Sequence, residues 1–180
     1  MKPDLNIALG FCQTLTGMTD TVLRYRMIHD TDRDAVPREF AANLFDAWPK
    51  IEGYQKRGYA CFYFLNEVGE ITPHRYARDT DVIKVRAIPA DIDNGDFPLQ
   101  LWEWHQTPDI LVHTSPGKGQ ALWLVKDFPL EDFKLTCLRI IAYYRSDKAV
   151  QNLSRVLRLP GTLHQKREPH LVTFEELARP

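Results

Sequence analysis

The chain has 180 residues, of which 44% are hydrophobic and 26% are charged, and its formal net charge is −1. Such a composition is ordinary for a soluble globular protein with a proper core, and the near-neutral charge excludes a protein that binds nucleic acid through a basic surface as a whole. No stretch approaches the roughly 20 apolar residues of a membrane span, and the first residues lack the apolar core of a signal peptide. The three cysteines are scattered and odd in number, which favours buried thiols of a cytoplasmic protein over disulfides or a metal site.

The first half of the chain predicts two helices and three strands. Apolar residues at helical spacing before Gly17 predict a helix, and β-branched and aromatic runs predict strands. Pro37 is a good first helical residue, so we place a second helix after it, with an interruption at Pro49. The expected elements are a helix over 4–16, a strand over 21–29, a helix over 37–58, a strand over 59–66 and a strand over 82–93, the last after an irregular polar segment over 72–81.

The second half predicts a β-hairpin among further helices. Two apolar runs flank the turn Pro-Gly-Lys-Gly, which is a strong hairpin signal. The expected elements are a short helix over 98–106, hairpin strands over 110–115 and 120–125, helices over 130–145 and 148–157, and a last strand over 170–175. This mixture of hairpins and helical crossovers favours an α+β fold, a mixed or antiparallel sheet flanked by helices, over a regular doubly wound one.

Two carboxylates follow each other at the end of the strand over 82–93. Because side chains alternate along a strand, Asp91 and Asp93 should point to one face, roughly 6–7 Å apart at their Cα atoms, with Ile88, Ala90 and Ile92 on the other. Like charges so placed suit a divalent cation between them, whereas the same letters also make a good solvated turn. Taken alone, the motif leaves both interpretations open.

The hairpin turn offers a second candidate site. Glycines on both sides of Lys118 could let backbone amides approach a phosphate, although a strand follows the turn, so this is not a Walker loop. An ordinary tight turn is the simpler interpretation of these residues.

A third candidate site is the cationic segment at residues 155–167. On the expected helix, Arg155 and Arg158 share one face, and His164 and Lys166 follow soon after. Such a cluster in a near-neutral protein suggests a polyanion site, and equally a solvated helix end. Asp147 precedes the expected helix and would be either its N-cap or a third metal-binding carboxylate.

Taken in order, these three motifs resemble the archaeo-eukaryotic primase superfamily. Asp-Ile-Asp after a strand, Thr-Ser-Pro-Gly-Lys-Gly-Gln-Ala-Leu-Trp on a hairpin, and Ser-Arg-Val-Leu-Arg-Leu-Pro-Gly-Thr are similar to the RepB-type primases and primase-polymerases of plasmids and phages. The resemblance extends from the first helix to Lys166. It implies a single catalytic domain over 1–180 with an RRM-like core, and a piece of a longer protein whose C-terminal helical domain is absent.

The resemblance also implies residue roles. Asp91, Asp93 and Asp147 are implied as catalytic ligands of Mg²⁺ or Mn²⁺. The implied nucleotide-binding residues are Ser115, Lys118, Gln120, His113, Arg155, Arg158, His164 and Lys166. In this family a histidine usually stands where this chain has Gln120, which can donate a hydrogen bond to a phosphate but carries no charge.

The function implied is template-directed nucleotidyl transfer by a DNA primase or primase-polymerase. The expected partners are a single-stranded DNA template, nucleoside triphosphates and a replicative or fused helicase, and the expected state is a cytoplasmic monomer without membrane contact. Two other classes stay open: a DNA-binding replication module of little or no activity, and a metal-dependent nuclease.

Overall fold

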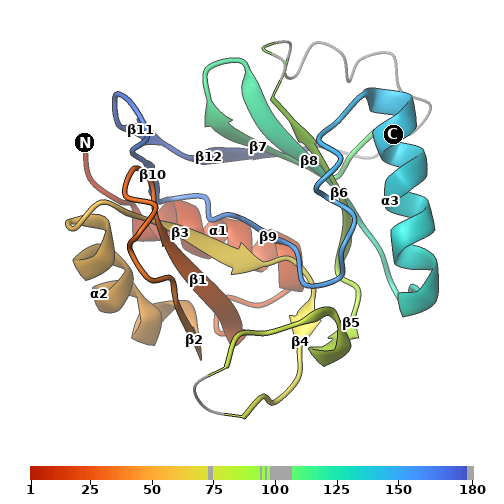
Figure 1. The fold of residues 1–180 in the computed structure, drawn as a ribbon, viewed down its shortest axis with the longest axis horizontal. Coiled ribbons are helices and arrows are strands. Elements are labelled where there is room, and N and C mark those ends of the chain that lie inside the picture. Colours follow the sequence, from red (N-terminus) through yellow and green to blue (C-terminus); the bar gives the residue numbers. More distant parts are fainter. Residues whose placement is uncertain (73–74, 94, 96, 98–106, 178–180) are drawn as a thin grey trace. The chain divides into compact units, whose positions relative to one another are not determined.

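The structure is a computed structural model, and it describes residues 1–72, 75–93, 95, 97 and 107–177. Figure 1 shows helices and strands in mixed order, as expected for an α+β protein. The helices are α1 Leu5–Thr16, α2 Leu44–Gln55 and α3 Leu130–Tyr144, with one 3-10 helix, η1 Asp79–Asp81. The strands are β1 Leu23–His29, β2 Arg38–Ala42, β3 Tyr59–Phe64, β4 Glu67–Val68, β5 Val82–Lys84, β6 Ala87–Ile92, β7 Ile110–Ser115, β8 Lys118–Leu124, β9 Val156–Arg158, β10 Leu163–His164, β11 His170–Leu171 and β12 Thr173–Glu176. No helix in these described ranges is long and apolar enough to cross a membrane.

The chain divides into two units by its internal contacts. The first comprises residues 1–64 and 156–173, and the second comprises residues 65–155 and 174–180. The first unit holds the sheet β2-β1-β3-β9, and the second holds the sheet β12-β7-β8-β6. That the two act as one catalytic domain stays a prediction.

The first unit is built on an antiparallel sheet whose alternate side chains are buried. Leu23, Tyr25 and Met27 of β1 are fully buried, as strand alternation requires. Helix α1 buries Phe11, which meets the ring of Tyr63 edge to face at 5.2 Å. The predicted helix over 4–16 and its stop at Gly17 are confirmed, and so are the strands over 21–29 and 59–66.

The second unit packs helix α3 against one face of its sheet. Phe133 and Cys137 of α3 form a buried cluster with Val85 and Ile88. The predicted hairpin and the helix over 130–145 are confirmed. Its sheet carries the residues that the sequence singles out.

The predicted helix over 37–58 is wrong in its first part. Residues 38–42 form β2, which pairs with β1 so that Phe40 lies opposite Tyr25. The helix begins only at Leu44, where the side chain of Asn43 accepts the N–H of Asp46 at 3.0 Å. Pairing along the edge of the sheet outweighs the helical propensity of this segment, while Pro49 is accommodated inside α2.

The predicted helix over 148–157 is wrong altogether. Residues 148–154 form turns, and 156–158 form β9 against β3. The Asp147 side chain accepts the N–H of Ala149 at 2.9 Å, a local bond that competes with helix formation. Arg155 and Arg158 therefore do not share a helix face.

Two predicted strands are each divided in two. The strand over 82–93 breaks at Val85 and Arg86, because β5 pairs with β4 and β6 pairs with β8. The last strand breaks at Val172, whose N–H donates to Thr162. The predicted helix over 98–106 lies outside the described residues.

Gly161 provides a test of the packing in the first unit. Its φ is +85°, and a Cβ there would lie 2.4 Å from the Asp4 carbonyl oxygen. We expect Gly161→Ala to lower the free energy of unfolding by about 2–4 kcal/mol through backbone strain and overpacking. Gly53→Ala, in α2 with open space around it, should instead raise it by about 0.5–1 kcal/mol. Urea unfolding of both variants measures the difference, and equal effects would contradict the prediction.

Candidate functional site

The two carboxylates of the first motif lie at the end of an edge strand. Strand β6 pairs only with β8 among the described strands of its sheet, so Pro89 removes no needed ladder bond. Asp91 lies opposite Gln120 of β8, and Asp93 follows the strand with its carboxylate 3.6 Å from the Lys118 ammonium. Ile88, Ala90 and Ile92 are buried, as the alternation predicted.

Gln120 brings a buried amide to the face that carries Asp91. Directly opposed residues of an antiparallel pair share a face, so the side chains of Asp91 and Gln120 are neighbours. Gln120 is 4% exposed, and its Oε1 has no hydrogen-bond partner in the part of the chain that the structure describes. A buried acceptor without a donor costs about 1–3 kcal/mol, so this position favours a ligand that donates to it.

The hairpin turn is tighter than the sequence suggested. Pro116 and Gly117 alone form it, with Gly117 at a φ of +70°, and Lys118 already begins β8. The ammonium of Lys118 is therefore held at the sheet edge beside Asp93 rather than inside a wide loop.

A β-bulge places His113 and Ser115 on opposite faces of the sheet, whereas residues two apart on a regular strand share a face. His113 pairs with Gly119, but Ser115 pairs with Lys118, so two steps along β7 match one along β8. Ser115 thus shares the face of Lys118, and His113 lies on the opposite one. His113 meets the ring of Phe97 at 5.2 Å and contacts the Glu175 carboxylate at 2.9 Å.

Asp147 lies directly beside the first motif. Its backbone N–H donates to the Asp91 carbonyl oxygen at 2.8 Å. Its carboxylate accepts the N–H of Ala149 and lies 4.0 Å from the Arg155 guanidinium. The structure thus brings together, in the second unit, most of the residues that the motifs predicted: Asp91, Asp93, Ser115, Lys118, Gln120, Asp147 and Arg155.

Arg155 is a partly buried cation with few partners. Its side chain is 24% exposed, and its Nε is buried without a hydrogen-bond partner among the described residues. The 4.0 Å contact with Asp147 is long for an ion pair, and charge-assisted hydrogen bonds are usually about 2.7–2.9 Å. A phosphate oxygen would satisfy this guanidinium better than its present neighbour does.

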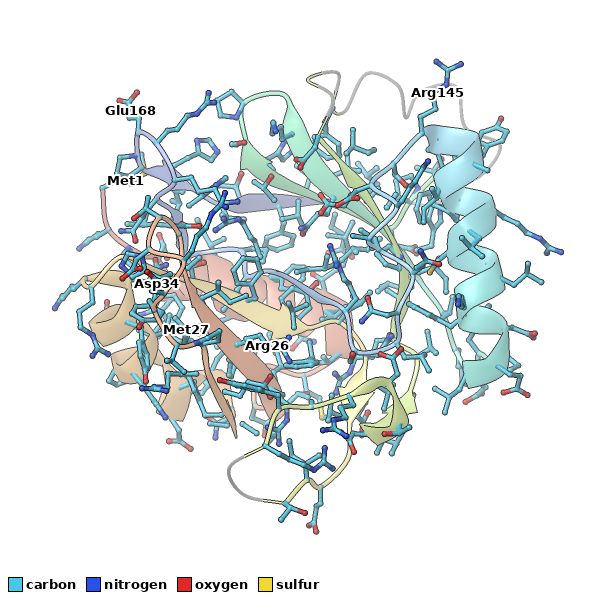
Figure 2. The ribbon with its side chains drawn as sticks, in the orientation of Figure 1. Met1, Arg26, Met27, Asp34, Arg145 and Glu168 are labelled. Carbon is cyan, nitrogen blue, oxygen red and sulfur yellow. The ribbon has the colours of Figure 1, made fainter. Side chains whose placement is uncertain are left out.

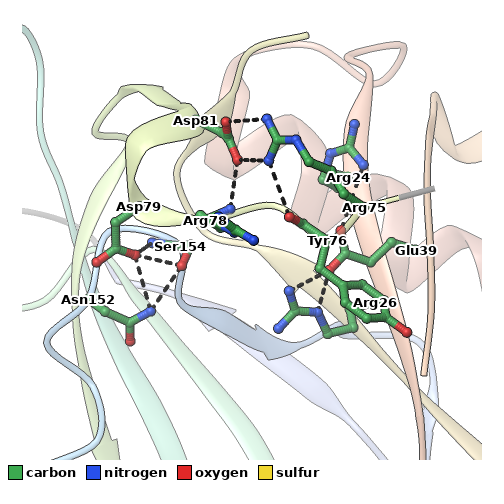
Figure 3. Close-up of polar contacts among 10 residues, drawn as sticks. All are labelled: Arg24, Arg26, Glu39, Arg75, Tyr76, Arg78, Asp79, Asp81, Asn152 and Ser154. Atoms are coloured by element: carbon green, nitrogen blue, oxygen red, sulfur yellow. Dashed lines mark hydrogen bonds and ion pairs between the residues drawn. The ribbon is translucent and has the colours of Figure 1, made fainter. Parts of the chain in front are cut away.

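The turn that leads to Arg155 is held by Asp79 (Figure 3). The Asp79 carboxylate accepts the N–H of Ser154 at 2.8 Å, its hydroxyl at 2.6 Å and the amide of Asn152 at 3.4 Å. Burial opposes the charge of Asp79, but these hydrogen bonds outweigh it and lower the pKa of Asp79. The carboxylate therefore stays ionised at neutral pH, and the turn stays anchored.

A second carboxylate fixes the short helix η1 that carries Asp79. Asp81 receives two hydrogen bonds from Arg75, at 2.6 and 2.7 Å, and the N–H of Arg78 (Figure 3). The hydrogen bonds from Arg75 and Arg78 lower the pKa of Asp81 to about 2. Neither Asp79 nor Asp81 was predicted as a functional residue, since nothing in their local sequence indicates that Asp79 contacts a segment 75 residues further along.

Arg158 is committed to a buried ion pair in the first unit. Its guanidinium donates to both oxygens of Asp30, at 2.6 and 3.4 Å, and stacks over the Phe62 ring. The Asp30 side chain, only 3% exposed, also accepts the N–H of Gln165 at 2.6 Å. This arrangement stabilises the fold of the unit; Arg158, with His164 and Lys166, is not brought to Asp91 by any contact inside the second unit.

The oxygen donors suit a hard divalent cation only in part. Asp91 and Asp93 offer carboxylates on one strand, and such oxygens are the ligands that Mg²⁺ and Mn²⁺ prefer. In the ranges that the structure describes, no three side chains among His, Cys, Asp and Glu are grouped to hold a metal. The Asp147 side chain would have to turn from Arg155 to complete such a group.

The fold is that of primases and primase-polymerases. The primase-polymerase catalytic domain of cyanophage S-2L matches with a TM-score of 0.77 and 22% identity over 98% of this chain and 91% of its own. The crystal structure of primase RepB′ matches with a TM-score of 0.63 and 15% identity over 96% of this chain and 56% of that one. The catalytic domain of RepB′ in complex with initiator DNA gives 0.62 and 18% over 96% and 84%.

Residues 96–176 match the family model of the RepB DNA-primase N-terminal domain. This match and the shared fold bear out the expected resemblance to RepB-like primases. The matched range includes the hairpin and the Arg155 segment and begins after Asp93. No curated protein matches the sequence.

Two arginines of the cationic segment at residues 155–167 should differ strongly in their contribution to stability. Arg158→Met leaves Asp30 buried without its cation and should lower the free energy of unfolding by about 3–5 kcal/mol. Arg167→Met, at an exposed position, should change it by less than about 0.5 kcal/mol. Denaturant unfolding measures both. The double variant Asp30→Asn, Arg158→Met should lose less than Arg158→Met alone, and an unchanged Arg158→Met would contradict the assignment.

Proposed function

We propose that the chain is the catalytic part of a DNA primase or primase-polymerase of plasmid or phage replication. In this proposal it works in the cytoplasm as a monomer and joins nucleoside triphosphates on a single-stranded DNA template. One observation carries the proposal: the Asp147 N–H bonds to the Asp91 carbonyl, at the end of a strand opposite Gln120 and Lys118. That bond joins Asp147 to the first motif, and the Asp147 carboxylate in turn lies 4.0 Å from Arg155 of the third motif.

In this proposal Asp91, Asp93 and Asp147 hold Mg²⁺ or Mn²⁺. Bound there, the cations would lower the pKa of a primer 3′-hydroxyl and neutralise charge on the leaving pyrophosphate. The chain's own contribution is positional: β6 carries Asp91 near its end, Asp93 follows the strand directly, and the bond to the Asp91 carbonyl keeps Asp147 within reach. Arg155 competes for the Asp147 carboxylate until an anion draws the guanidinium away.

The triphosphate would be held by Lys118, Gln120 and Arg155, with Ser115 on the same face. Each is in the second unit, and two of them carry positive charge that Asp93 and Asp147 only partly neutralise at 3.6 and 4.0 Å. The amide nitrogen of Gln120 would donate to a phosphate oxygen. Little proton transfer by side chains is needed, because positioning and charge neutralisation supply most of the rate.

The DNA partner is proposed from the RepB′ catalytic domain, whose solved structure contains initiator DNA. His113, Arg158, His164 and Lys166 remain predicted contacts of nucleotide or template. Of these, Arg158 is the weakest candidate, because Asp30 already neutralises it. A replicative helicase, separate or fused, remains a proposed partner.

Two observations favour an alternative, a DNA-binding replication module with little catalysis. Within the described residues no group of three metal-binding side chains is assembled, and a neutral Gln120 stands where a histidine is usual in the resembling family. Such a module would bind DNA in a salt-dependent way, whatever happens to the carboxylates.

Removal of the carboxylates tests the proposal. Asp91→Asn with Asp93→Asn should lower primer synthesis or extension on single-stranded DNA by about a thousandfold, which corresponds to about 4 kcal/mol. Asp46→Asn, at the start of α2, is the control and should leave the rate unchanged. Labelled template and primer are followed on a gel with Mg²⁺ or Mn²⁺. Parental activity in the double variant refutes the metal site, salt-dependent binding without synthesis supports the alternative module, and template degradation identifies a nuclease.

Arg155 tests the nucleotide contacts. Arg155→Ala should raise the KM for the nucleoside triphosphate about tenfold or more, because a charge-assisted hydrogen bond is worth about 1.5–3 kcal/mol. Arg139→Ala, at an exposed position of α3, removes the same charge from the same unit and should leave KM unchanged. Steady-state kinetics over a range of nucleotide concentrations separates KM from kcat. A KM that rises equally little in both variants would exclude Arg155 from the triphosphate site.

A further inference from the structure

A cavity of about 510 Å³ lies at the C-terminal end of α3, in the second unit. Its apolar wall is formed by Leu138, Ile141 and Ala142 of α3, and its polar wall by Arg145, Ser146, Lys148 and Gln151. Its volume is within the range of about 300–1,000 Å³ that is usual for ligand sites. None of these residues takes part in the proposed reaction.

Three polar groups of this wall have no hydrogen-bond or ion-pair partner in the described part of the chain. Arg145 and Lys148 are exposed and have no ion-pair partner in the described part of the chain. Figure 2 shows Arg145 at the end of α3, with its side chain pointing away from the helix. The Ser146 hydroxyl is buried, in a residue that is 7% exposed, and it has no hydrogen-bond partner among the described residues. The two cations suit carboxylates, and the Ser146 hydroxyl suits an acceptor such as a backbone carbonyl of an occupant.

The apolar wall continues beyond the cavity. Leu135 and Leu138, three residues apart and so on one helix face, are 53% and 41% exposed. With Ala142 they extend the apolar surface over about two turns of α3. An occupant of this length is a polypeptide segment rather than a single small molecule.

The backbone conformation of Arg145 allows a matched test of its side chain. Arg145 ends α3 with a φ of +53°, the left-handed region in which glycine is favoured. Asp127 has the same kind of φ, +51°, in the same unit but does not line the cavity. The two positions form a matched pair of substitutions. Glycine relieves backbone strain at both Arg145 and Asp127, but it removes a cation only at Arg145.

We propose that the α3 cavity docks an acidic peptide segment of a partner protein, with a bulky apolar side chain between α3 and Ser146 and its carboxylates on Arg145 and Lys148. Because Ser146 and Lys148 flank Asp147, the docked partner would be held next to the proposed site. Docking does not depend on the proposed catalysis, since no lining residue takes part in it.

The test is fluorescence anisotropy of the whole chain with a fluorescein-labelled peptide in which four acidic residues precede a leucine and a phenylalanine. We expect a dissociation constant in the range of tens of micromolar. Arg145→Gly should raise the urea midpoint and yet weaken binding about tenfold, a combination that a purely structural residue does not give. Asp127→Gly should raise the urea midpoint and leave binding unchanged.

Two further comparisons decide the chemistry of the occupant. A peptide with serines in place of the leucine and phenylalanine, and one with amides in place of the carboxylates, should each bind at least tenfold more weakly. Equal binding of either peptide, or unchanged binding to Arg145→Gly, overturns the proposal.

The proposal is also overturned if the chain sediments as a dimer that Leu138→Glu dissociates, because the occupant is then a second copy. Peptide binding should persist in Asp91→Asn with Asp93→Asn, so loss of synthesis and loss of docking are distinguishable.

Discussion

The candidate site depends on one backbone hydrogen bond, from the N–H of Asp147 to the carbonyl oxygen of Asp91, at 2.8 Å. Among the described strands, β6 lies at the edge of its sheet. The backbone groups on its side away from β8 therefore need partners from elsewhere. The segment after α3 supplies one of them. The bond therefore completes the edge of the sheet and brings a third carboxylate beside the first motif in a single step, although 56 positions separate the two residues in the sequence numbering.

The segment that carries Asp147 and Arg155 has no regular secondary structure of its own between α3 and β9. Its position is set instead by side chains that bind backbone: Asp147 on Ala149, and Asp79 on Ser154. The Asn66 side chain adds a third such bond, to the Leu153 carbonyl at 2.9 Å. Loops held in this way can place charges accurately without a helix, which is how many binding residues are positioned.

The elements with strong local patterns were predictable, and those fixed by distant contacts were not. Helices α1 and α3, strand β3 and the β7-β8 hairpin follow from periodicity and turn chemistry. Residues 38–42 and 148–157 were predicted as helical because their local composition allows it. Residues 38–42 instead pair with β1, and the hydrogen bond from Ser154 to Asp79 holds the second segment in a turn. The face on which His113 lies was also not predictable. One extra residue in β7 inverts the alternation of side chains, and no residue type in the sequence marks this bulge. The pair Asp91 and Gln120 was within reach of sequence reasoning because regular pairing persists there.

In the proposed site, Gln120 stands where the resembling family usually has a histidine, and this difference would change how the site responds to a ligand. A buried imidazole beside the Asp91 carboxylate would exchange a proton as pH changes, and its affinity for phosphate would follow that charge. The amide is neutral at every pH, and it can donate to an oxygen and accept a hydrogen bond at once. In the described part of the chain its acceptor is unmet, so the unliganded protein carries a cost that a suitable ligand removes. Affinity then depends on the match of hydrogen bonds at Gln120, while positive charge for a phosphate must come from Lys118 and Arg155.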